Sequence, residues 1–511
     1  MGIGATAGVA AIGTGVGWQA SAEGASGTLV FDRTAYKTVT ETITTDAGDK
    51  EVEYHFYGPI TYVTNPSDDT HQSLVVSVPV KIDGKTVDAT DAPIVFANGI
   101  GGYFPSSVAT ATGVGQSTME MGGGGAPGGG TGPGGGGGGG GGAKQISMPK
   151  LGLAAGYVVV EPGARGRSLT DSSGVYYGTA PAAIVDLKAA VRYVRANKGR
   201  IPGNTDRIVS TGVSAGGALS SLLGASGDSK IYESYLKEAG AAHAGDAIFA
   251  VGAWCPITDL EHADAAYEFC WGDSKTQPTG AVVDQTVAKA LQSQFAEHQA
   301  SLKLPGLHHF GRLTARNYDE YLVKTYMQPA ATKYLAALSD ADRTTYLAAN
   351  TFITWSGSKA TFTWSDYVTH VGARKKTTPA FDAFDLSAGE NNEYGLGTTS
   401  ARHFTQYALD NDTTGLTSKR LASDIPEKLR LMNPMHHLAQ KNPGRSKHWW
   451  IRVGTNDTDS SPVIVANLAA AAADLGDDVS SLMYWDGAHG ANDDAADFIT
   501  WIAKVTGHKR K

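Results

Sequence analysis

Cysteine is scarce in this chain: its 511 residues include only Cys255 and Cys270. Two cysteines can build neither a disulfide scaffold nor a cysteine-based metal cluster. They lie in one segment, so they could pair in an oxidising compartment or could be two separate buried thiols. The sequence contains no other convincing metal motif, and we expect the protein to need neither a metal ion nor a cofactor.

Charged residues are also few, at 18% of the chain, and the formal net charge is −8. Runs of Lys and Arg are at most three residues long, at Arg374-Lys375-Lys376 and at the last three residues, Lys509 to Lys511. Because nucleic-acid binding needs a basic patch, we expect no nucleic-acid partner, and an acidic polymer is a poor candidate substrate. No stretch reaches the roughly 18–20 apolar residues of a membrane-spanning helix, so we expect no membrane span.

A positively charged start is missing from the N-terminal segment. Residues 2–17 are small and apolar, and Ala20-Ser21-Ala22 is similar to the cleavage site of a secretory signal peptide. We interpret residues 1–22 as a truncated signal segment of the twin-arginine type. This interpretation predicts export to a periplasmic or extracellular location, whereas the alternative is a Gly/Ala-rich leader without a targeting role.

Glycine, by contrast, is abundant, with 65 residues in the chain, and it dominates residues 121–143. Such a segment cannot bury enough side-chain surface to offset the entropy that it would lose on ordering. We therefore expect a disordered surface loop. A phosphate-binding loop is not indicated, because Gly-Lys-Ser/Thr and a strand-to-helix frame are missing here.

Apolar runs of strand length alternate with helical stretches along most of the remaining chain. Residues 28–90 read as antiparallel strands, and residues 181–197 read as an amphipathic helix in which Ile184, Leu187 and Val191 share one face. This alternation predicts an α/β fold with a mostly parallel central sheet. The expected strands are residues 28–31, 52–57, 74–80, 93–97, 156–160, 208–210, 247–253, 449–453 and 480–485.

The chain is organised around Gly212-Val213-Ser214-Ala215-Gly216, which follows an expected strand and precedes a helix of small residues. A serine on such a sharp strand-to-helix turn projects its hydroxyl above the sheet, where a base can reach it. The flanking glycines allow the backbone to approach closely without a Cβ clash. The pattern indicates that Ser214 is a nucleophile, and the alternative is a Gly-rich turn with an ordinary capping serine.

An acid and a base follow Ser214 in the chain order that is typical of α/β-hydrolases. Asp457 comes just after one expected core strand, and His489 comes just after the last one. His489 would accept the Ser214 proton and return it to the leaving group, while Asp457 would hold the imidazole tautomer. The alternatives are a solvated loop aspartate and a surface histidine.

A glycine-rich loop, residues 98–103, follows the expected core strand 93–97. α/β-Hydrolases place one oxyanion donor in such a loop and the other at the residue after the nucleophile. We therefore expect the N–H groups of Gly101, or of Ile100 beside it, and of Ala215 to form the oxyanion hole. A plain glycine turn is the alternative for the loop.

The alternation of strands and helices breaks between residues 275 and 425. This segment lies between the expected nucleophile and the acid, where α/β-hydrolases carry a cap. We expect a core in two parts, residues 23–274 and 426–511, with a large inserted lid domain, residues 275–425, between them. The Gly-rich loop 121–143 would belong to the first part of the core.

From about residue 90 to 500 the chain resembles the bacterial tannases (tannin acylhydrolases), which are α/β-hydrolases with a large inserted lid. The resemblance implies that Lys376, Glu390 and Asp459 hold the three phenolic hydroxyls of a galloyl group. Phenols are donors that suit carboxylates, and an ammonium group balances the charge. A surface charge pair is the alternative for Lys376 and Glu390. The residues that carry the resemblance are 98–103, 161–167, 179–186, 211–220, Lys376 with 390–392, Gly454 with Asp457 and Asp459, and 487–489.

Val213 and Gly490 distinguish this chain from the fungal tannases and related feruloyl esterases, which place cysteines beside the nucleophile and the histidine. We expect a serine esterase that cleaves small galloyl esters through an acyl-enzyme. The alternatives are a broader aryl or feruloyl esterase with the same residues, a serine peptidase, or a catalytically inactive binding module. The sequence leaves the oligomeric state open.

Overall fold

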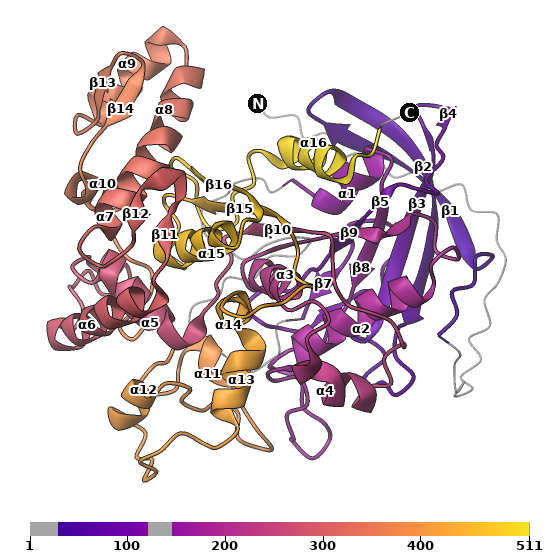
Figure 1. The fold of residues 1–511 in the computed structure, drawn as a ribbon, viewed down its shortest axis with the longest axis horizontal. Helices are drawn as coiled ribbons and strands as arrows, with labels where there is room; N and C mark the ends of the chain where they lie inside the picture. The colour runs from indigo at the N-terminus through magenta and orange to yellow at the C-terminus, as the bar shows by residue number, and fades with distance from the viewer. Residues whose placement is uncertain (1–28, 121–145, 510–511) are drawn as a thin grey trace, which may run out of the picture.

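The structure, a computed structural model, describes residues 29–120 and 146–509. The expected signal segment, residues 1–22, and the Gly-rich segment, residues 121–143, lie outside the described residues. At the centre is a ten-stranded sheet with the order β1-β2-β3-β8-β5-β9-β10-β15-β16, to which β4 is added beside β3 (Figure 1). Its strands are β1 (Tyr36–Thr45), β2 (Gly48–Thr61), β3 (Ser73–Ile82), β4 (Lys85–Thr86), β5 (Pro93–Ala97), β8 (Val158–Pro162), β9 (Asn204–Val213), β10 (Ala250–Trp254), β15 (His448–Gly454) and β16 (Asp478–Tyr484).

The strands from β8 to β16 in this order are parallel to one another, whereas β1, β2, β3 and β4 pair in antiparallel fashion. The predicted α/β class with a mostly parallel central sheet is thus confirmed. Helices cover both faces, as Figure 1 shows. They are α1 (Met148–Ala154), α2 (Ala182–Ala196), α3 (Ala215–Ala225), α4 (Glu233–Glu238), α5 (Leu260–Trp271), α13 (Ile425–Met432), α14 (Pro434–Leu438), α15 (Pro462–Asp474) and α16 (Ala495–Thr506).

The central strands are buried on both faces. Ile208 of β9 packs in the core cluster that includes α2, α3 and α15, while its neighbour Val209 packs in the cluster with α1 and α16. A strand that is covered on both sides needs apolar residues at successive positions. This explains why the central strands are apparent in the sequence as short continuous apolar runs.

The N-terminal edge of the sheet differs from the sequence-based expectation. The described residues of the expected strand 28–31 form no strand, although the Phe31 N–H donates to Asn197 Oδ1 at 2.8 Å. The first strand is instead β1, which pairs with β2 along its whole length. Ile43 is the only buried residue of β1. Since an edge strand needs few apolar side chains, β1 lacked the signal by which the other strands were predicted.

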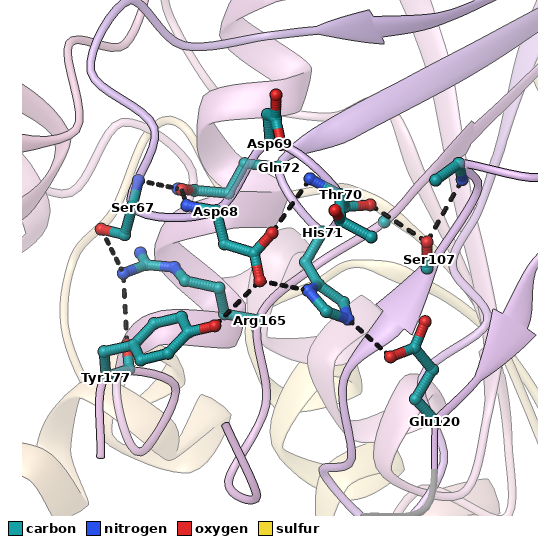
Figure 2. A network of polar contacts seen from close by, with 12 residues as sticks. Ser67, Asp68, Asp69, Thr70, His71, Gln72, Ser107, Glu120, Arg165 and Tyr177 are labelled. Atoms are coloured by element: carbon teal, nitrogen blue, oxygen red, sulfur yellow. Dashed lines mark hydrogen bonds and ion pairs between the residues drawn. The ribbon is translucent and has the colours of Figure 1, made fainter. Parts of the chain in front are cut away.

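A polar network attaches the antiparallel strands to the loop that follows β8 (Figure 2). The Tyr177 hydroxyl donates to Asp68 Oδ2 at 2.9 Å, and Arg165 donates to the Tyr177 carbonyl oxygen at 3.3 Å. His71 lies between two carboxylates, 2.6 Å from Asp68 Oδ2 and 3.2 Å from Glu120 Oε2. Burial by itself would raise the pKa of Asp68, but the hydrogen bonds from His71 and Tyr177 lower it below its ordinary value. The network therefore keeps a charged carboxylate in a half-buried position.

Between β10 and β15 the chain leaves the sheet and forms a mainly helical region that projects from one side of the molecule (Figure 1). No strand–helix alternation runs through it, as the sequence predicted. None of the helices among the described residues is long and apolar enough to cross a membrane. The α-helices and strands within residues 275–425 are α6 (Gln285–Leu302), β11 (Pro305–Gly306), β12 (Gly311–Arg312), α7 (Tyr318–Leu322), α8 (Gln328–Ala337), α9 (Asp340–Ala349), β13 (Thr354–Ser356), β14 (Lys359–Thr361), α10 (Trp364–Val371), α11 (Gly389–Glu393) and α12 (Gln406–Asp410).

A fully buried ion pair connects α2 to the segment before β10. Lys188 Nζ lies 2.7 Å from Asp246 Oδ1, and both side chains are 0% exposed. Removing the carboxylate leaves the ammonium group buried without its counter-charge. We expect Asp246→Ala to lower the free energy of unfolding by about 3–5 kcal/mol, measured by urea denaturation. The control is Glu53→Ala, which breaks the half-exposed pair with Lys81 and should cost less than about 1 kcal/mol; equal losses would contradict the prediction.

Candidate active site

Three parallel strands end at the same edge of the sheet, and a polar residue follows each of them. Ser214 comes directly after β9, Asp457 follows β15, and His489 follows β16. Because the carboxyl ends of parallel strands open on one edge, these side chains can meet although they are far apart in the sequence. The fold thus places the three predicted residues together.

The three side chains form a continuous hydrogen-bonded chain. Ser214 Oγ lies 2.9 Å from His489 Nε2, and His489 Nδ1 lies 2.8 Å from Asp457 Oδ2. The other oxygen of Asp457, which is buried, accepts the N–H of Asp459 at 2.9 Å. The carboxylate is therefore held on both oxygens and faces the imidazole in a fixed orientation.

The backbone at Ser214 is strained, with φ 59° and ψ −122°. An L-residue with a side chain rarely adopts this conformation, so surrounding contacts must hold it. The Ser214 N–H donates to the Trp254 carbonyl oxygen at 2.9 Å. A Cβ on Gly216 would lie 2.6 Å from Asn98 Oδ1, and one on Gly212 would lie 2.4 Å from the Gly216 carbonyl oxygen. The close approach that the sequence predicted for the flanking glycines is therefore present.

Asn98 joins the glycine-rich loop to the turn at Ser214. Its Nδ2 donates to the Gly216 carbonyl oxygen at 3.1 Å and to Ser220 Oγ at 3.0 Å. The side chain is buried, so these bonds are shielded from water. Sequence analysis did not assign Asn98 a role of its own; its position, directly after a buried strand and before the glycines, was the available signal.

Of the two expected oxyanion donors, Ala215 lines the cavity above Ser214 and Gly101 does not. Ala215 is the first residue of α3, and the first N–H groups of a helix have no partner within it. On the other side, Gly102 and Tyr103 line the cavity above Ser214, next to the expected donor Gly101. The assignment of Gly101 and Ala215 as oxyanion donors stays a prediction.

A cavity of about 140 Å³ opens above Ser214. All three residues that the resemblance assigned to a galloyl group line it: Asp459 follows β15, whereas Lys376 and Glu390 come from α11 and the segment before it. Lys376 Nζ lies 3.5 Å from Glu390 Oε1, and Lys376 is also 3.7 Å from the ring centroid of Phe381. The lining residues are Gly102, Tyr103, Ser214, Ala215, Ile257, Lys376, Glu390, Asp459 and His489.

Two charged residues that sequence analysis did not single out shape this cavity. Lys375 Nζ pairs with Asp459 Oδ1 at 2.6 Å, so neighbouring lysines contact the two carboxylates of the cavity. Arg167 donates from Nε to the Gly102 carbonyl oxygen and from a terminal nitrogen to the Gly389 carbonyl oxygen, both at 2.7 Å. Arg167 therefore connects the glycine-rich loop to the start of α11, the helix that carries Glu390.

Cys255 is a further residue of this site that sequence analysis missed. Its Sγ lies 4.0 Å from His489 Nε2, directly after the end of β10. Burial disfavours the charged imidazole, but the Asp457 carboxylate and the Cys255 sulfur raise the pKa of His489 well above its ordinary value. Cys270 lies elsewhere, 3.2 Å from Ser461 Oγ, and both cysteines are free and buried. Of the two possibilities for the cysteines, the structure therefore contains separate thiols.

Comparison with known proteins shows which family the chain is similar to. A family model described as BD-FAE matches residues 137–300. A search of curated sequences found no match. Among solved structures, tannin acyl hydrolase from Lactobacillus plantarum matches with a TM-score of 0.76 and 31% identity over 94% of this chain and 99% of its own. Fusobacterium nucleatum tannase matches with a TM-score of 0.75 and 32% identity over the same shares of the two chains.

Two further matching structures contain small aromatic molecules. They are a tannin acyl hydrolase in complex with 3,4-dihydroxybenzoate, with a TM-score of 0.77, and one in complex with ethyl gallate, with a TM-score of 0.76; each is 31% identical, over 94% of this chain and 99% of its own. Identity at this level, extending over nearly the full length of both chains, establishes common family membership. The α/β-hydrolase fold and the resemblance found in the sequence are thereby confirmed, and the chain belongs to the bacterial tannase family.

Proposed function

We propose that the protein is a serine esterase that hydrolyses galloyl esters through an acyl-enzyme. The observation that carries this proposal is the hydrogen-bonded chain of Ser214, His489 and Asp457 beneath a cavity with two carboxylates and an ammonium group. The match to a tannin acyl hydrolase in complex with ethyl gallate supports the same substrate class.

In the proposed reaction, Ser214 Oγ attacks the ester carbonyl carbon while His489 Nε2 takes the hydroxyl proton. The resulting oxyanion accepts hydrogen bonds from the N–H groups of Ala215 and Gly101. The C–O bond to the alcohol then breaks, and His489 returns the proton to the leaving oxygen. In the second half, water attacks the galloyl–Ser214 ester while His489 takes its proton; the bond between the acyl carbon and Ser214 Oγ breaks, gallic acid leaves, and His489 returns the proton to Oγ. Asp457 stabilises the imidazolium in both halves.

The size and polarity of the cavity suit one polyhydroxylated ring. A cavity of roughly 150 Å³ holds one benzene molecule, and this cavity has about 140 Å³. Phenolic hydroxyls would donate to Glu390 and Asp459, while Lys376 offsets the two negative charges. A carbonyl carbon attached to such a ring would lie near Ser214, which lines the same cavity.

We infer that residues 275–425 act as the lid of this site. The insertion supplies Lys376 and Glu390, whereas the core supplies Ser214 and His489. Substrate would therefore bind between the two parts. Arg167 contacts both of them and would fix their relative position at the cavity.

Two measurements test the proposed function. A fluorophosphonate should label Ser214, which mass spectrometry of the digested protein would locate, whereas a catalytically inactive module would remain unlabelled. In an ester panel, kcat/KM should be higher for methyl gallate than for methyl protocatechuate, and much higher than for methyl ferulate. A preference for methyl ferulate, or equal values throughout, would favour the broader aryl or feruloyl esterase instead.

Asp457→Asn should change both the rate and its pH dependence. The amide would favour the wrong imidazole tautomer, and kcat should fall by roughly 10⁴. The base must be neutral to act, so kcat/KM falls at low pH as His489 becomes protonated. Because the Asp457 carboxylate raises the pKa of His489, its removal should move this acid limb to lower pH. The measurement is a pH profile of kcat/KM for methyl gallate.

The control for this profile is Asp340→Asn, which makes the same change at a carboxylate that is 97% exposed. It should leave both the rate and the acid limb unchanged. If kcat/KM of Asp457→Asn fell at the same acidic pH as in the unmutated protein, a group other than His489 would set the pH dependence.

A further inference from the structure

Helix α5, which the structure describes in full, contributes no residue to the wall of the cavity above Ser214, yet it contacts two segments that do. One is the loop after β15 that carries Asp457 and Asp459, here called the acid loop. The other is the turn at Lys375 and Lys376, here called the lysine turn. The acid loop belongs to the core and the lysine turn to the insertion, so α5 contacts both parts of the pocket.

Two side chains of α5 hold the acid loop by its backbone. The Tyr267 hydroxyl donates to the Thr458 carbonyl oxygen at 2.6 Å, and the Trp271 indole N–H donates to the Ser460 carbonyl oxygen at 3.1 Å. Residues four apart on a helix lie on the same face, so both side chains reach the same loop. Thr458 lies between the candidate acid and Asp459, and its carbonyl group therefore anchors the part of the loop that carries both carboxylates.

Tyr267 also holds the lysine turn. Its hydroxyl oxygen accepts the Lys376 backbone N–H at 3.2 Å. A phenolic hydroxyl can donate one hydrogen bond and accept another at the same time. The Tyr267 ring packs edge-to-face on Phe381, with 5.9 Å between the ring centroids, and the Lys376 ammonium group lies 3.7 Å from the centroid of Phe381. One side chain thus connects the backbone of the acid loop to that of the lysine turn.

Arg374 fixes the lysine turn from the other side. Its guanidinium group donates to the carbonyl oxygens of Lys376 and Thr377, both at 2.9 Å. It also donates to the two carboxylate oxygens of Glu268 in α5, at 2.7 and 2.5 Å, and to the Trp271 carbonyl oxygen at 3.1 Å. Both charged side chains are 0% exposed. A planar guanidinium group makes such a two-pronged contact in a fixed orientation, so the turn is fixed relative to α5.

The lysine turn supplies an ammonium group to each carboxylate of the pocket. Lys375 Nζ lies 2.6 Å from Asp459 Oδ1, and Lys376 Nζ lies 3.5 Å from Glu390 Oε1. A lysine carries its charge on a flexible four-carbon stem, so the position of that charge depends on how well the backbone beneath it is held. Residues outside the cavity wall therefore control where the positive charges of the pocket lie.

We propose that Tyr267 and Arg374 are positioning residues that set the specificity of the galloyl pocket, because they hold the lysine turn in place against the acid loop. This inference rests on the proposed function. A displacement of about 1 Å at a site can cost roughly 10²-fold in rate, so a small shift of the turn should weaken selection for phenolic hydroxyls. Asp457 keeps its own contacts with His489 and with the Asp459 N–H, so the acyl-transfer step should be preserved.

Tyr267→Phe tests the proposal, because it removes only the hydroxyl group and keeps the ring against Phe381. We expect kcat/KM for methyl gallate to fall about 10–100-fold, mainly through a higher KM. Hydrolysis of p-nitrophenyl acetate, whose acyl group does not reach the two carboxylates, should stay within about twofold of the unmutated rate. Isothermal titration of methyl gallate into the Ser214→Ala protein, with and without Tyr267→Phe, measures the same loss as binding without turnover.

The matched control is Tyr232→Phe. Tyr232 is also buried, and its hydroxyl donates to a backbone carbonyl oxygen, that of Leu431 in α13, at 2.6 Å. Both variants lose a buried hydrogen bond and should lower the thermal midpoint by similar amounts, but Tyr232→Phe should keep the ratio of methyl gallate to p-nitrophenyl acetate hydrolysis. Arg374→Lys should lower this ratio at least as much as Tyr267→Phe, since lysine cannot make the two-pronged contact; Tyr267→Phe decides the question if Arg374→Lys fails to fold.

The outcomes separate this inference from the proposed function. Equal kcat/KM for methyl gallate and methyl benzoate in the unmutated protein would overturn the proposed function and this inference with it. A gallate preference and a methyl gallate affinity that Tyr267→Phe left unchanged would overturn the positioning role alone. Equal losses on methyl gallate and p-nitrophenyl acetate, or a similar fall of their ratio in Tyr232→Phe, would also overturn it, because the effect would then not be specific to the galloyl pocket.

Discussion

Replacing Ser214 with alanine should lower kcat for methyl gallate by about 10⁶ and leave the fold intact, because a nucleophile and its base act as one unit. The hydroxyl is the atom that His489 contacts at 2.9 Å, and no other hydroxyl among the lining residues lies after a strained strand-to-helix turn. His489→Ala should be nearly as severe for the same reason. Steady-state kinetics, with circular dichroism to verify the fold, give the measurement.

The matched control for this prediction is Cys255→Ala. Its thiol is the other nucleophilic group near the imidazole, with Sγ 4.0 Å from His489 Nε2. We expect this variant to keep most of its activity. If Ser214→Ala retained more than roughly a tenth of the wild-type rate while Cys255→Ala lost activity, the nucleophile would be the cysteine, and the proposed mechanism would be wrong.

Methyl gallate should exceed methyl benzoate by roughly 10⁴–10⁵ in kcat/KM. A site built to bind hydroxyl groups rejects an analogue that lacks them by about this factor, because its buried polar groups then lose their partners. Glu390, Asp459 and Lys376 all line the cavity above Ser214, so a benzoyl ring would leave three charged groups without phenolic partners. The measurement is kcat/KM for the two methyl esters under the same conditions.

Variants of the carboxylates test the reason for this selectivity. Glu390→Ala and Asp459→Ala should shrink the gallate-to-benzoate ratio and spare hydrolysis of p-nitrophenyl acetate, whose acyl group is too short to reach them. The control is Glu320→Ala, at a half-exposed carboxylate of the insertion that pairs with Lys324; its ratio should not change. Comparable kcat/KM for gallate and benzoate in the unmutated protein would leave a general aryl esterase.

The sequence by itself determined the central sheet and the turn at Ser214. Strands with two covered faces need successive apolar residues, so β5, β9 and β10 are apparent as short apolar runs. A side chain on Gly212 or Gly216 would collide with neighbouring atoms, so the turn at Ser214 requires glycine at both positions. The two glycines can therefore be recognised from the sequence. Residues that follow parallel strands share an edge, which made Asp457 and His489 predictable partners from chain order.

The edge strand β1 was not predictable in the same way. Of its side chains only Ile43 is buried, so burial imposed almost no pattern on the sequence. Pairing with β2 is made by backbone groups, which every residue type except proline supplies in the same way. The expected strand at residues 28–31 was wrong because three apolar residues in succession do not require a strand partner.

Only the tertiary structure decided which side chains from distant segments meet. Cys255 and not Cys270 lies beside His489, because β10 ends next to β9 while Cys270 sits at the far end of α5. Lys375 reaches Asp459 only because the insertion folds back over the sheet edge, and α6 brings His298 to Asp259. Contacts of this kind depend on how two distant segments pack against each other. The hydrophobic pattern of each segment predicts its own secondary structure but not the position of the other segment.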